Sequence, residues 1–479
     1  MPVALAAAMV LVALRASPAA AEPPWSPPQA LGRAADHVEQ PAIGFGSDGT
    51  ALLSWLTRMG AGGLPIKAGH NNDGYAGRLA TLSGGIASLR RTLPDSLATP
   101  PAVYGRDRVA MLRSLVLSST AYGNRRVRLT AAFGTTRGAV GRARTLTTAT
   151  LLTPPALATD GRGDAVAAWA EYNDTTTPRG EVETYTLRVA MRRSGHRFAR
   201  ARTLLRTAGF ATDHGGQVTA AYGADGTVVV AFARSREVGR RSVREVDAFV
   251  ARPRRGFGPR LLVGPQNGFT NIAAAVNRAG KAVVAWGTQD GGEEANTPWT
   301  VRAATLPAGA RTFRPAQTLY VSQGIDRPAA TVALGLTDAG IATVAWSGVS
   351  GTRPSFTYPV LASTSDGAGR FGVPQEVAPN GALGDLALAR DGRALLTWAR
   401  VAGGSYQITD QVFAALRPAG ATAFGPPEAV APPDVASEPH AAFDPVTGRP
   451  TVVWSARPNG HDPSLGVGTT GMFLVSTRG

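Results

Sequence analysis

The sequence of 479 residues contains no cysteine. This absence excludes a disulfide scaffold, a thiol enzyme and a zinc or iron–sulfur site with cysteine ligands. Aromatic residues make up only 7% and charged residues 17% of the chain, whereas 57 glycines and 35 prolines indicate many turns. Because the hydrophobic fraction of 44% still allows a large core, we expect a turn-rich fold with little helix.

Lysine is almost absent, and Lys67 and Lys281 are the only two in the chain. The formal charge of +16 therefore comes from arginine. These arginines are scattered, without the Lys/Arg-rich block or stripe that is typical of nucleic-acid-binding proteins. We interpret the excess of arginine over lysine as a feature of composition and expect no nucleic-acid partner.

Apolar runs long enough to span a membrane are also missing. The apolar segment from Val3 to Leu14 is too short, and it is followed by Ala19-Ala20-Ala21, which fits the small-residue site of a signal peptidase. We therefore predict a secretory signal peptide over residues 1–21. The mature protein, residues 22–479, is expected to be secreted or associated with the cell envelope and not to span a membrane.

One unit recurs along the chain. A glycine is followed six residues later by Trp or Phe at Gly49/Trp55, Gly163/Trp169, Gly226/Phe232, Gly280/Trp286, Gly340/Trp346, Gly392/Trp398 and Gly448/Trp454, and Arg106/Leu112 stands in the same register. The period is about 57 residues, which fits the blades of a β-propeller. We call Trp55, Leu112, Trp169, Phe232, Trp286, Trp346, Trp398 and Trp454 the anchor residues and expect them in the core, because they follow the repeat.

Each unit reads as four strands, which we call a to d. The glycine lies in a turn between an alanine-rich strand a and a β-branched strand b such as Val228–Val230, the pattern of a hairpin. Strand c follows a variable loop. Strand d is marked by an apolar residue and Leu or Val six later, at Val140/Leu146, Phe198/Leu204, Phe257/Val263, Phe313/Leu319, Phe371/Val377 and Phe424/Val430.

The two ends of the chain complement each other. The last unit stops after its strand c, Met472–Thr477, whereas Trp25–Leu31 copies the strand d pattern of Phe424–Val430. A ring closed by its own termini leaves no open edge. We predict an all-β, eight-bladed β-propeller of four-stranded antiparallel blades, with a seven-bladed ring as the alternative. Residues 22–32 supply the outer strand of the last blade, and the blades span about 36–93, 94–146, 147–205, 206–263, 264–319, 320–377, 378–431 and 432–479.

One turn between strands c and d carries a recognisable motif. Thr364, Asp366, Ala368 and Phe371 match three of the four positions of Ser/Thr-x-Asp-x-Gly-x-x-Trp/Phe. In this the chain resembles secreted propellers of the sialidase type with Asp-box (BNR) repeats. Sialidases have six blades and an Arg-Ile-Pro signature, and this sequence has eight units and no Arg-Ile-Pro. The resemblance therefore implies a fold and a secreted setting, and no catalytic residue is assigned.

Histidines and acidic residues gather in the connections at the junction of the first and last blades. We expect the b–c and d–a connections to share one face, so candidate ligand-binding residues there are His37, His70, Asp73, His440 and His461. Imidazole and carboxylate groups suit both cation binding and acid–base chemistry. The alternative is that they are ordinary solvated loop residues. Because no metal-ligand spacing is present, we assign no metal and no cofactor.

Arginine recurs just after the anchor at Arg58, Arg113, Arg234, Arg400 and Arg457. These residues predict a partial cationic ring on the same face, suited to an anionic ligand, with Glu171 and Tyr172 as further polar contacts. The alternative is chance placement in an arginine-rich chain.

The sequence favours a monomeric binding module for an extracellular glycan, an anionic polymer or a protein, and favours it over an enzyme. The alternative is a glycan-active hydrolase or lyase with a sialidase-like architecture, and a structural envelope component is a third possibility.

Overall fold

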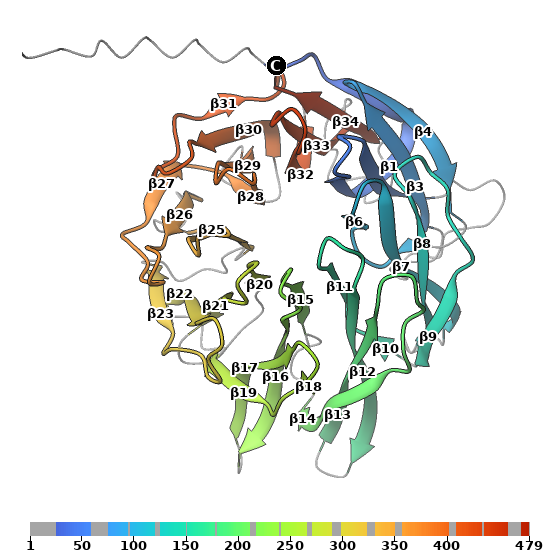
Figure 1. Ribbon diagram of the computed structural model, residues 1–479, viewed down its shortest axis with the longest axis vertical. Helices are drawn as coiled ribbons and strands as arrows, with labels where there is room; N and C mark the ends of the chain where they lie inside the picture. Colours follow the sequence, from blue (N-terminus) through green and yellow to red (C-terminus); the bar gives the residue numbers. More distant parts are fainter. Residues whose placement is uncertain are drawn as a thin grey trace, which may run out of the picture.

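A computed structural model describes residues 25–58, 75–93, 96–119, 125–149, 151–177, 180–210, 217–238, 241–265, 271–289, 298–322, 331–349, 357–401, 409–433, 435–457 and 471–478. All regular secondary structure in these residues is β-strand. The strands form eight antiparallel blades around a central axis (Figure 1). The eight-bladed β-propeller prediction is therefore confirmed, and the seven-bladed alternative is wrong.

The blades follow one another in chain order. Blade 1 contains the second part of β1 (Gln29–Phe45), β2 (Ala51–Arg58), β3 (Tyr75–Ser83) and β4 (Ile86–Thr92). Blade 2 contains β5 (Ser96–Leu97), β6 (Ala102–Tyr104), β7 (Arg108–Ser119), β8 (Arg125–Thr135) and β9 (Arg144–Ala149). Blade 3 contains β10 (Leu151–Leu152), β11 (Ala156–Thr159), β12 (Ala165–Thr177), β13 (Gly180–Arg192) and β14 (Arg202–Phe210). Blade 4 contains β15 (Val218–Tyr222), β16 (Val228–Val238), β17 (Arg241–Arg252), β18 (Gly256–Phe257) and β19 (Leu261–Pro265).

The second half of the ring is more uniform. Blade 5 contains β20 (Ile272–Val276), β21 (Ala282–Gln289), β22 (Trp299–Leu306) and β23 (Gln317–Val321). Blade 6 contains β24 (Val332–Leu336), β25 (Ala342–Ser347), β26 (Val360–Thr364) and β27 (Gln375–Ala378). Blade 7 contains β28 (Ala382–Leu388), β29 (Ala394–Val401), β30 (Thr409–Arg417) and β31 (Glu428–Ala429). Blade 8 contains β32 (Val435–Phe443), β33 (Pro450–Arg457), β34 (Gly471–Thr477) and the first part of β1.

The repeated glycine forms the turn between strands a and b. Gly226 has a φ of 90°, a left-handed conformation that favours glycine, and Asp225 Oδ1 accepts a hydrogen bond of 2.9 Å from the Thr227 N–H. In blade 2 the left-handed residue is Gly105, one position before Arg106. The degenerate unit thus keeps its turn by placing the glycine one residue earlier.

The anchor residues form the core, as predicted. All eight are at most 1% exposed. They pack across blade boundaries: Trp55 of blade 1 stacks on Phe473 of blade 8 with ring centroids 4.5 Å apart. Trp286 belongs to the cluster that joins blade 5 to blade 4, and its Nε1 donates to the Pro265 carbonyl at 3.0 Å. Burial of these side chains between sheets is what holds neighbouring blades together.

The ring is closed by the N-terminal strand. Gln29 pairs with Val475 and Leu31 with Phe473, and the Ser26 N–H donates to the Thr477 carbonyl at 2.9 Å. The two ends of the described chain therefore meet in one blade. β1 then continues without a break into blade 1, because Asp36 still pairs with Gly471 and the next residue already pairs with Arg58. The connection that the sequence predicts as a loop is thus part of a strand.

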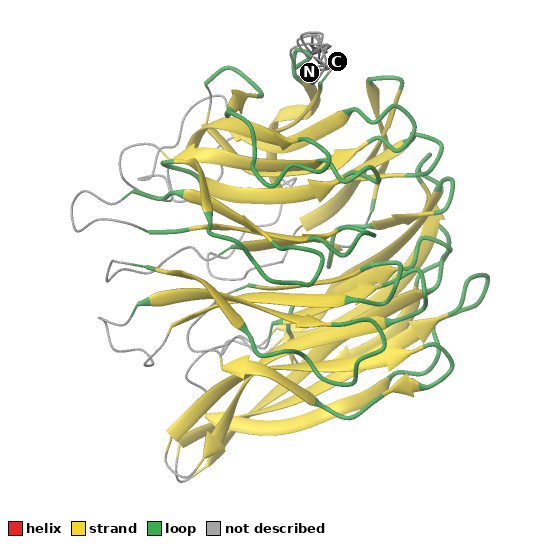
Figure 2. Cartoon of the chain, turned by 60° about the vertical axis from the view of Figure 1, so that its left-hand side comes forward, coloured by secondary structure: helices red, strands yellow, loops and turns green. Residues whose placement is uncertain are grey.

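The innermost strands β1, β6, β11, β15, β20, β24, β28 and β32 contact one another in sequence around the axis. The described a–b and c–d turns lie together at one side of the ring (Figure 2). Lys281 illustrates this arrangement, since its Nζ donates to the Gly340 carbonyl in an a–b turn and to the Gly367 carbonyl, at 3.1 Å, in a c–d turn. We call this side the turn face.

The sequence predicts a variable loop between strands b and c, and in two blades this connection is short. β12 and β13 pair as far as Thr177 with Gly180, and β16 and β17 as far as Val238 with Arg241. These connections are therefore short hairpins on extended strands.

Candidate functional site

The five arginines predicted to form a ring have different environments in the structure. Arg234 is 4% exposed, and its Nη2 lies 2.9 Å from Glu245 Oε2 while its Nε bonds to Asp247 Oδ2. Burial raises the pKa of Asp247, against the hydrogen bond and charge of Arg234. This arginine therefore balances two buried carboxylates inside blade 4 rather than facing a ligand.

Arg400 is also paired. Its Nε and Nη2 donate to the two carboxylate oxygens of Asp410 at 2.8 and 2.9 Å, and the guanidinium lies 5.7 Å from the centroid of the Phe413 ring. Arg113 is buried, at 7% exposed. The side chains of Arg58 and Arg457 lie outside the described part of the structure, so for them the ring remains a prediction.

Glu171 has a structural environment. Its Oε1 accepts hydrogen bonds from Trp169 Nε1 at 3.2 Å and Thr147 Oγ1 at 2.7 Å, and its Oε2 pairs with Arg188 Nε at 2.7 Å. The carboxylate thus orients the anchor tryptophan of blade 3. The backbone of Tyr172 pairs with Tyr185 within the same sheet, and its side chain lies outside the described part.

Other arginines bind across blade boundaries on the turn face. Arg252 at the end of β17 donates to the Ala310 carbonyl of blade 5 at 2.7 Å. Arg417 at the end of β30 donates to Thr343 Oγ1 and Thr364 Oγ1 of blade 6 at 2.6 and 2.7 Å. Burial lowers the pKa of Arg417. A planar group with several donors suits this role, so Arg252 and Arg417 have a structural explanation.

The c–d turn that resembles an Asp-box is held by its aspartate. Asp366 Oδ1 accepts a hydrogen bond of 2.8 Å from the Arg370 N–H, and the Asp366 N–H donates to the Arg370 carbonyl at 2.8 Å. The hydrogen bond from the Arg370 backbone is the main cause that lowers the pKa of Asp366. This motif stabilises a turn on the surface of blade 6.

Of the predicted histidine patch, the structure describes one side chain. His70, Asp73 and His461 lie outside the described residues, and His37 is described only by its backbone, which pairs with Arg58. His440 lies on β32, and its Nδ1 is 3.5 Å from Asp385 Oδ2 on β28. These two strands are the innermost strands of blades 8 and 7, so the pair lies at the axis of the ring.

Asp385 was missed at the sequence level. Its Oδ1 accepts a 2.8 Å hydrogen bond from the Leu386 N–H, and its Oδ2 accepts one of 3.2 Å from the Ala441 N–H across the blade boundary. Burial would raise the pKa of Asp385, but the hydrogen bond and charge of His440 and these backbone groups outweigh it, and the pKa is lowered. Alignment of the repeat units could have found this residue, because alanine occupies the same place in several other blades.

A cavity of about 900 Å³ lies on the turn face, next to the strand segments that carry Asp385 and His440, and neither of these two side chains lines it. Its wall is formed by inner strands and a–b turns of blades 1, 2, 7 and 8, with Gly161 of blade 3. Ala387 and Ala441, neighbours of Asp385 and His440 on their strands, line it. We call it the axial cavity. Its rim carries Tyr104 and Phe443, and an ion pair of 2.7 Å between Arg393 Nε and Asp391 Oδ2.

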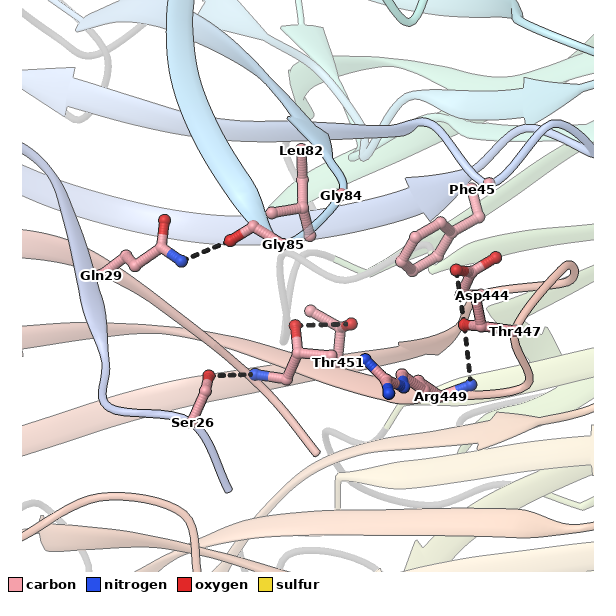
Figure 3. A pocket seen from close by; sticks show the side chains of 12 residues that line it. Ser26, Gln29, Phe45, Leu82, Gly84, Gly85, Asp444, Thr447, Arg449 and Thr451 are labelled. Atoms are coloured by element: carbon pink, nitrogen blue, oxygen red, sulfur yellow. Dashed lines mark hydrogen bonds between the residues drawn. The ribbon is translucent and has the colours of Figure 1, made fainter. Parts of the chain in front are cut away.

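A smaller pocket of about 270 Å³ lies at the seam between blades 8 and 1 (Figure 3). Its wall includes residues near both ends of the described chain, with Ser26 Oγ accepting a 3.0 Å hydrogen bond from the Thr477 N–H. Figure 3 shows the Arg449 side chain extending into this pocket and Asp444 turned toward Thr447, whose Oγ1 donates to it at 2.6 Å. The pocket is hydroxyl-rich and belongs to the closure of the ring.

Within the described ranges, no group of three or more His, Asp or Glu side chains is arranged to hold a metal ion. A search of the same residues finds no helix with the length and apolar character needed to cross a membrane.

Comparison with known proteins identifies no family for this chain. No protein family matches the sequence, and no curated protein matches it. Similar solved structures include a protein of unknown function from Dyadobacter fermentans, with 11% identity and a TM-score of 0.36 over 68% of this chain and 93% of that chain. An ulvan lyase, a polysaccharide lyase bound to GlcA(1-4)Rha3S, has 11% identity and a TM-score of 0.42 over 79% and 94%. The NanB sialidase of Streptococcus pneumoniae has 11% identity and a TM-score of 0.38 over 80% and 68%. At these values the likeness carries no assignment of activity to this chain.

Proposed function

We propose that this protein is a secreted, monomeric binding module that holds an extracellular glycan in the axial cavity. One observation carries the proposal: inner strands of four blades converge on a cavity of about 900 Å³, a volume typical of ligand sites. Its lining combines the buried Tyr104, and Phe443 beneath the Arg393 guanidinium, with the charged groups of Asp391 and Arg393. Apolar side chains and fixed polar groups together suit a ring that is apolar on one side and hydroxylated at its edge.

A glycan array on residues 22–479 tests this proposal when wild type is compared with Ala387→Trp, which fills the cavity. Ala275→Trp is the matched control, because Ala275 has the same register in blade 5 and does not line the cavity. We expect glycan binding by wild type and the control and loss of binding by Ala387→Trp. Absence of any glycan ligand, or retention of binding by Ala387→Trp, overturns the proposal.

The enzymatic alternative is favoured by one observation, the Asp385–His440 pair beside the cavity. Carboxylate and imidazole groups can exchange protons with a substrate. Release of new reducing ends from the glycan found on the array, followed over time, supports a hydrolase or lyase. A stable complex with no product supports the binding module.

Secretion is part of the proposal and has its own test. Expression of the full chain in a host with a secretory pathway, followed by N-terminal sequencing of protein from the medium, is expected to give a start at Glu22. Retention of the complete N-terminus inside the cell contradicts it.

A further inference from the structure

The Asp385–His440 pair occupies one defined place in the repeat. In each of seven blades, one inner-strand residue pairs with the residue just before the anchor, and we call this the axial position. Its occupants in blades 1, 3, 4, 5, 6, 7 and 8 are Ala42, Ala156, Thr219, Ala273, Ala333, Asp385 and His440. Five of the seven are small, and the two ionisable residues lie in adjacent blades. A chance scatter of charged residues has no reason to favour the same register twice in succession.

The backbone departs from the regular pattern at the same place. The inner strands β28, β32 and β1 each contain a register shift, next to Asp385, next to His440 and between Glu39 and Ala42. In the β1 bulge, Gln40 has a φ of 52°, which is rare for a residue with a side chain. Comparable shifts occur between Leu97 and Ala102 in blade 2 and between Leu152 and Ala156 in blade 3, whereas the described inner-strand pairs of blades 4 to 6 keep one register. Such bulges re-aim side chains and are frequent beside functional sites.

The bulges of blades 7 and 8 are packed against each other. A Cβ atom on Gly384 would lie 2.1 Å from the Pro439 carbonyl oxygen, so this approach requires glycine. The fully buried Thr397 places its Oγ1 3.4 Å from the Asp385 carbonyl and 3.3 Å from the Pro439 carbonyl. These contacts fix the two bulges relative to each other and therefore fix the distance between Asp385 and His440.

The pair is both held and accessible. The side chains of Asp385 and His440 are 32% and 34% exposed. Each carboxylate oxygen can accept about two hydrogen bonds, and within the described residues Asp385 Oδ1 accepts one, from Leu386. The carboxylate therefore has capacity for a hydroxyl donor from a ligand. It also faces Nδ1 of His440 and so favours the imidazole form with a proton on that nitrogen.

We propose that Asp385 and His440 form a preorganised site at the axis that binds the hydroxyl groups of a neutral sugar. This inference rests on the proposed function and narrows its ligand class from glycans in general to uncharged ones. An anionic carboxylate accepts hydrogen bonds from sugar hydroxyls and repels carboxylate or sulfate groups. The pair thus selects against the acidic polymers that the arginine content alone suggests.

The first test measures occupancy of the pair directly. ¹⁵N NMR of the histidine side chains is recorded while methyl glucoside or methyl galactoside is added to about 50 mM, well above a weak dissociation constant of about 1 mM. His196, which lies in a c–d turn, is the internal control. We expect saturable shifts of His440 with neutral glycosides and none with glucuronate or with Zn²⁺. Absence of any His440 shift, or a stronger response to glucuronate or to Zn²⁺, overturns the inference.

The second test uses variants. Asp385→Asn and His440→Gln are each expected to weaken binding of the neutral glycoside about tenfold or more, because a hydrogen bond to a charged or preorganised group is lost. Asp338→Asn, an exposed turn residue of blade 6 paired with Arg278, is the control and is expected to bind as wild type. Unchanged affinity in both site variants, with unchanged unfolding temperatures, contradicts the inference. If Ala387→Trp still binds glycan on the array, only the proposed function is contradicted. The NMR experiment reports on Asp385 and His440 themselves and tests the further inference separately.

Discussion

The ring contains two arcs that share one scaffold and differ at the axis. In blades 4 to 6 the described inner strands keep one register, and their axial positions hold alanine or threonine. In blades 7, 8, 1, 2 and 3 the register of the inner strand shifts, and the axial positions of blades 7 and 8 hold Asp385 and His440. The anchor residues are buried alike in both arcs. The comparison teaches that the repeat specifies the scaffold, whereas departures from the repeat mark the place where a ligand site can be built.

Deletion of residues 22–32 should lower the unfolding temperature more than any other change considered. It removes the strand that pairs with β34 and so opens the edge of blade 8, within the bulged arc. We expect a fall in the unfolding temperature of well over 10 °C or loss of soluble protein, because an ordinary change of 1 kcal/mol moves it by only about 2–4 °C in a large domain. The control truncation stops before Trp25. An unfolding temperature that survives the longer deletion would contradict closure of the ring.

Removal of an anchor should cost the same in both arcs. Trp398→Ala in the bulged arc and Trp286→Ala in the regular arc each create a cavity in a buried sheet interface, at a cost of about 3–5 kcal/mol. Urea unfolding of both variants measures this free energy. Arg400→Ala is the control, since its half-exposed pair with Asp410 contributes less than about 1 kcal/mol. A cost for Arg400 above that for Trp398 would show that the wrong side chain has been placed in the core.

Gly384→Ala should affect the bulged arc alone. The added methyl group meets the Pro439 carbonyl, and overpacking of this kind costs about 1–3 kcal/mol. The displacement should also alter the His440 side-chain NMR signals. Gly367→Ala is the matched control, because a Cβ atom there meets open space. Equal stability of the two variants would mean that the close approach of the bulges does not restrain the pair.

The smallest expected effect is a change in the pH dependence of stability. The folded-state pKa of Asp385 lies below its unfolded value of about 3.9. Its stabilisation is therefore complete above that value and is lost as the pH falls through the folded-state pKa. Because the group is one-third exposed, we expect less than about 1 kcal/mol. Asp385→Asn should remove this acid-side slope in urea unfolding between pH 2 and 5, and an identical slope in both proteins would refute it.

The scaffold could be predicted from the sequence, and most of the site could not. The anchors recur at a fixed distance after a turn glycine, and Trp25–Leu31 copies a strand d, so local pattern alone gave the blades and their closure. His440 was also among the predicted site residues. Asp385 was not, because its partner lies in another blade and the contact depends on two bulges and on Gly384, whose role is visible only when the backbones meet.

For the arginines, the sequence predicts the position of the side chain but not whether its charge is paired. Arg234 and Arg400 recur after the anchors in the pattern of a cationic surface, yet each is paired with an acidic residue on the neighbouring strand. Position in the repeat predicted where these side chains lie, and only the cross-strand partners, Glu245 and Asp410, decide whether their charge is available to a ligand.

The closing strand also has a consequence for how the chain folds. Ser26 and Ser476 hydrogen bond although 450 residues separate them, so blade 8 contains contacts of very long sequence separation. The entropy of closing such a loop grows only slowly with its length, but contacts of this kind form late and slow the folding of the whole domain. Blades 1 to 7 can each assemble from one continuous stretch of chain. The segment Gln29–Leu31, in contrast, is made before the intervening blades and its partner β34 after them, so among the described strands the one that makes the ring continuous must stay unpaired longest.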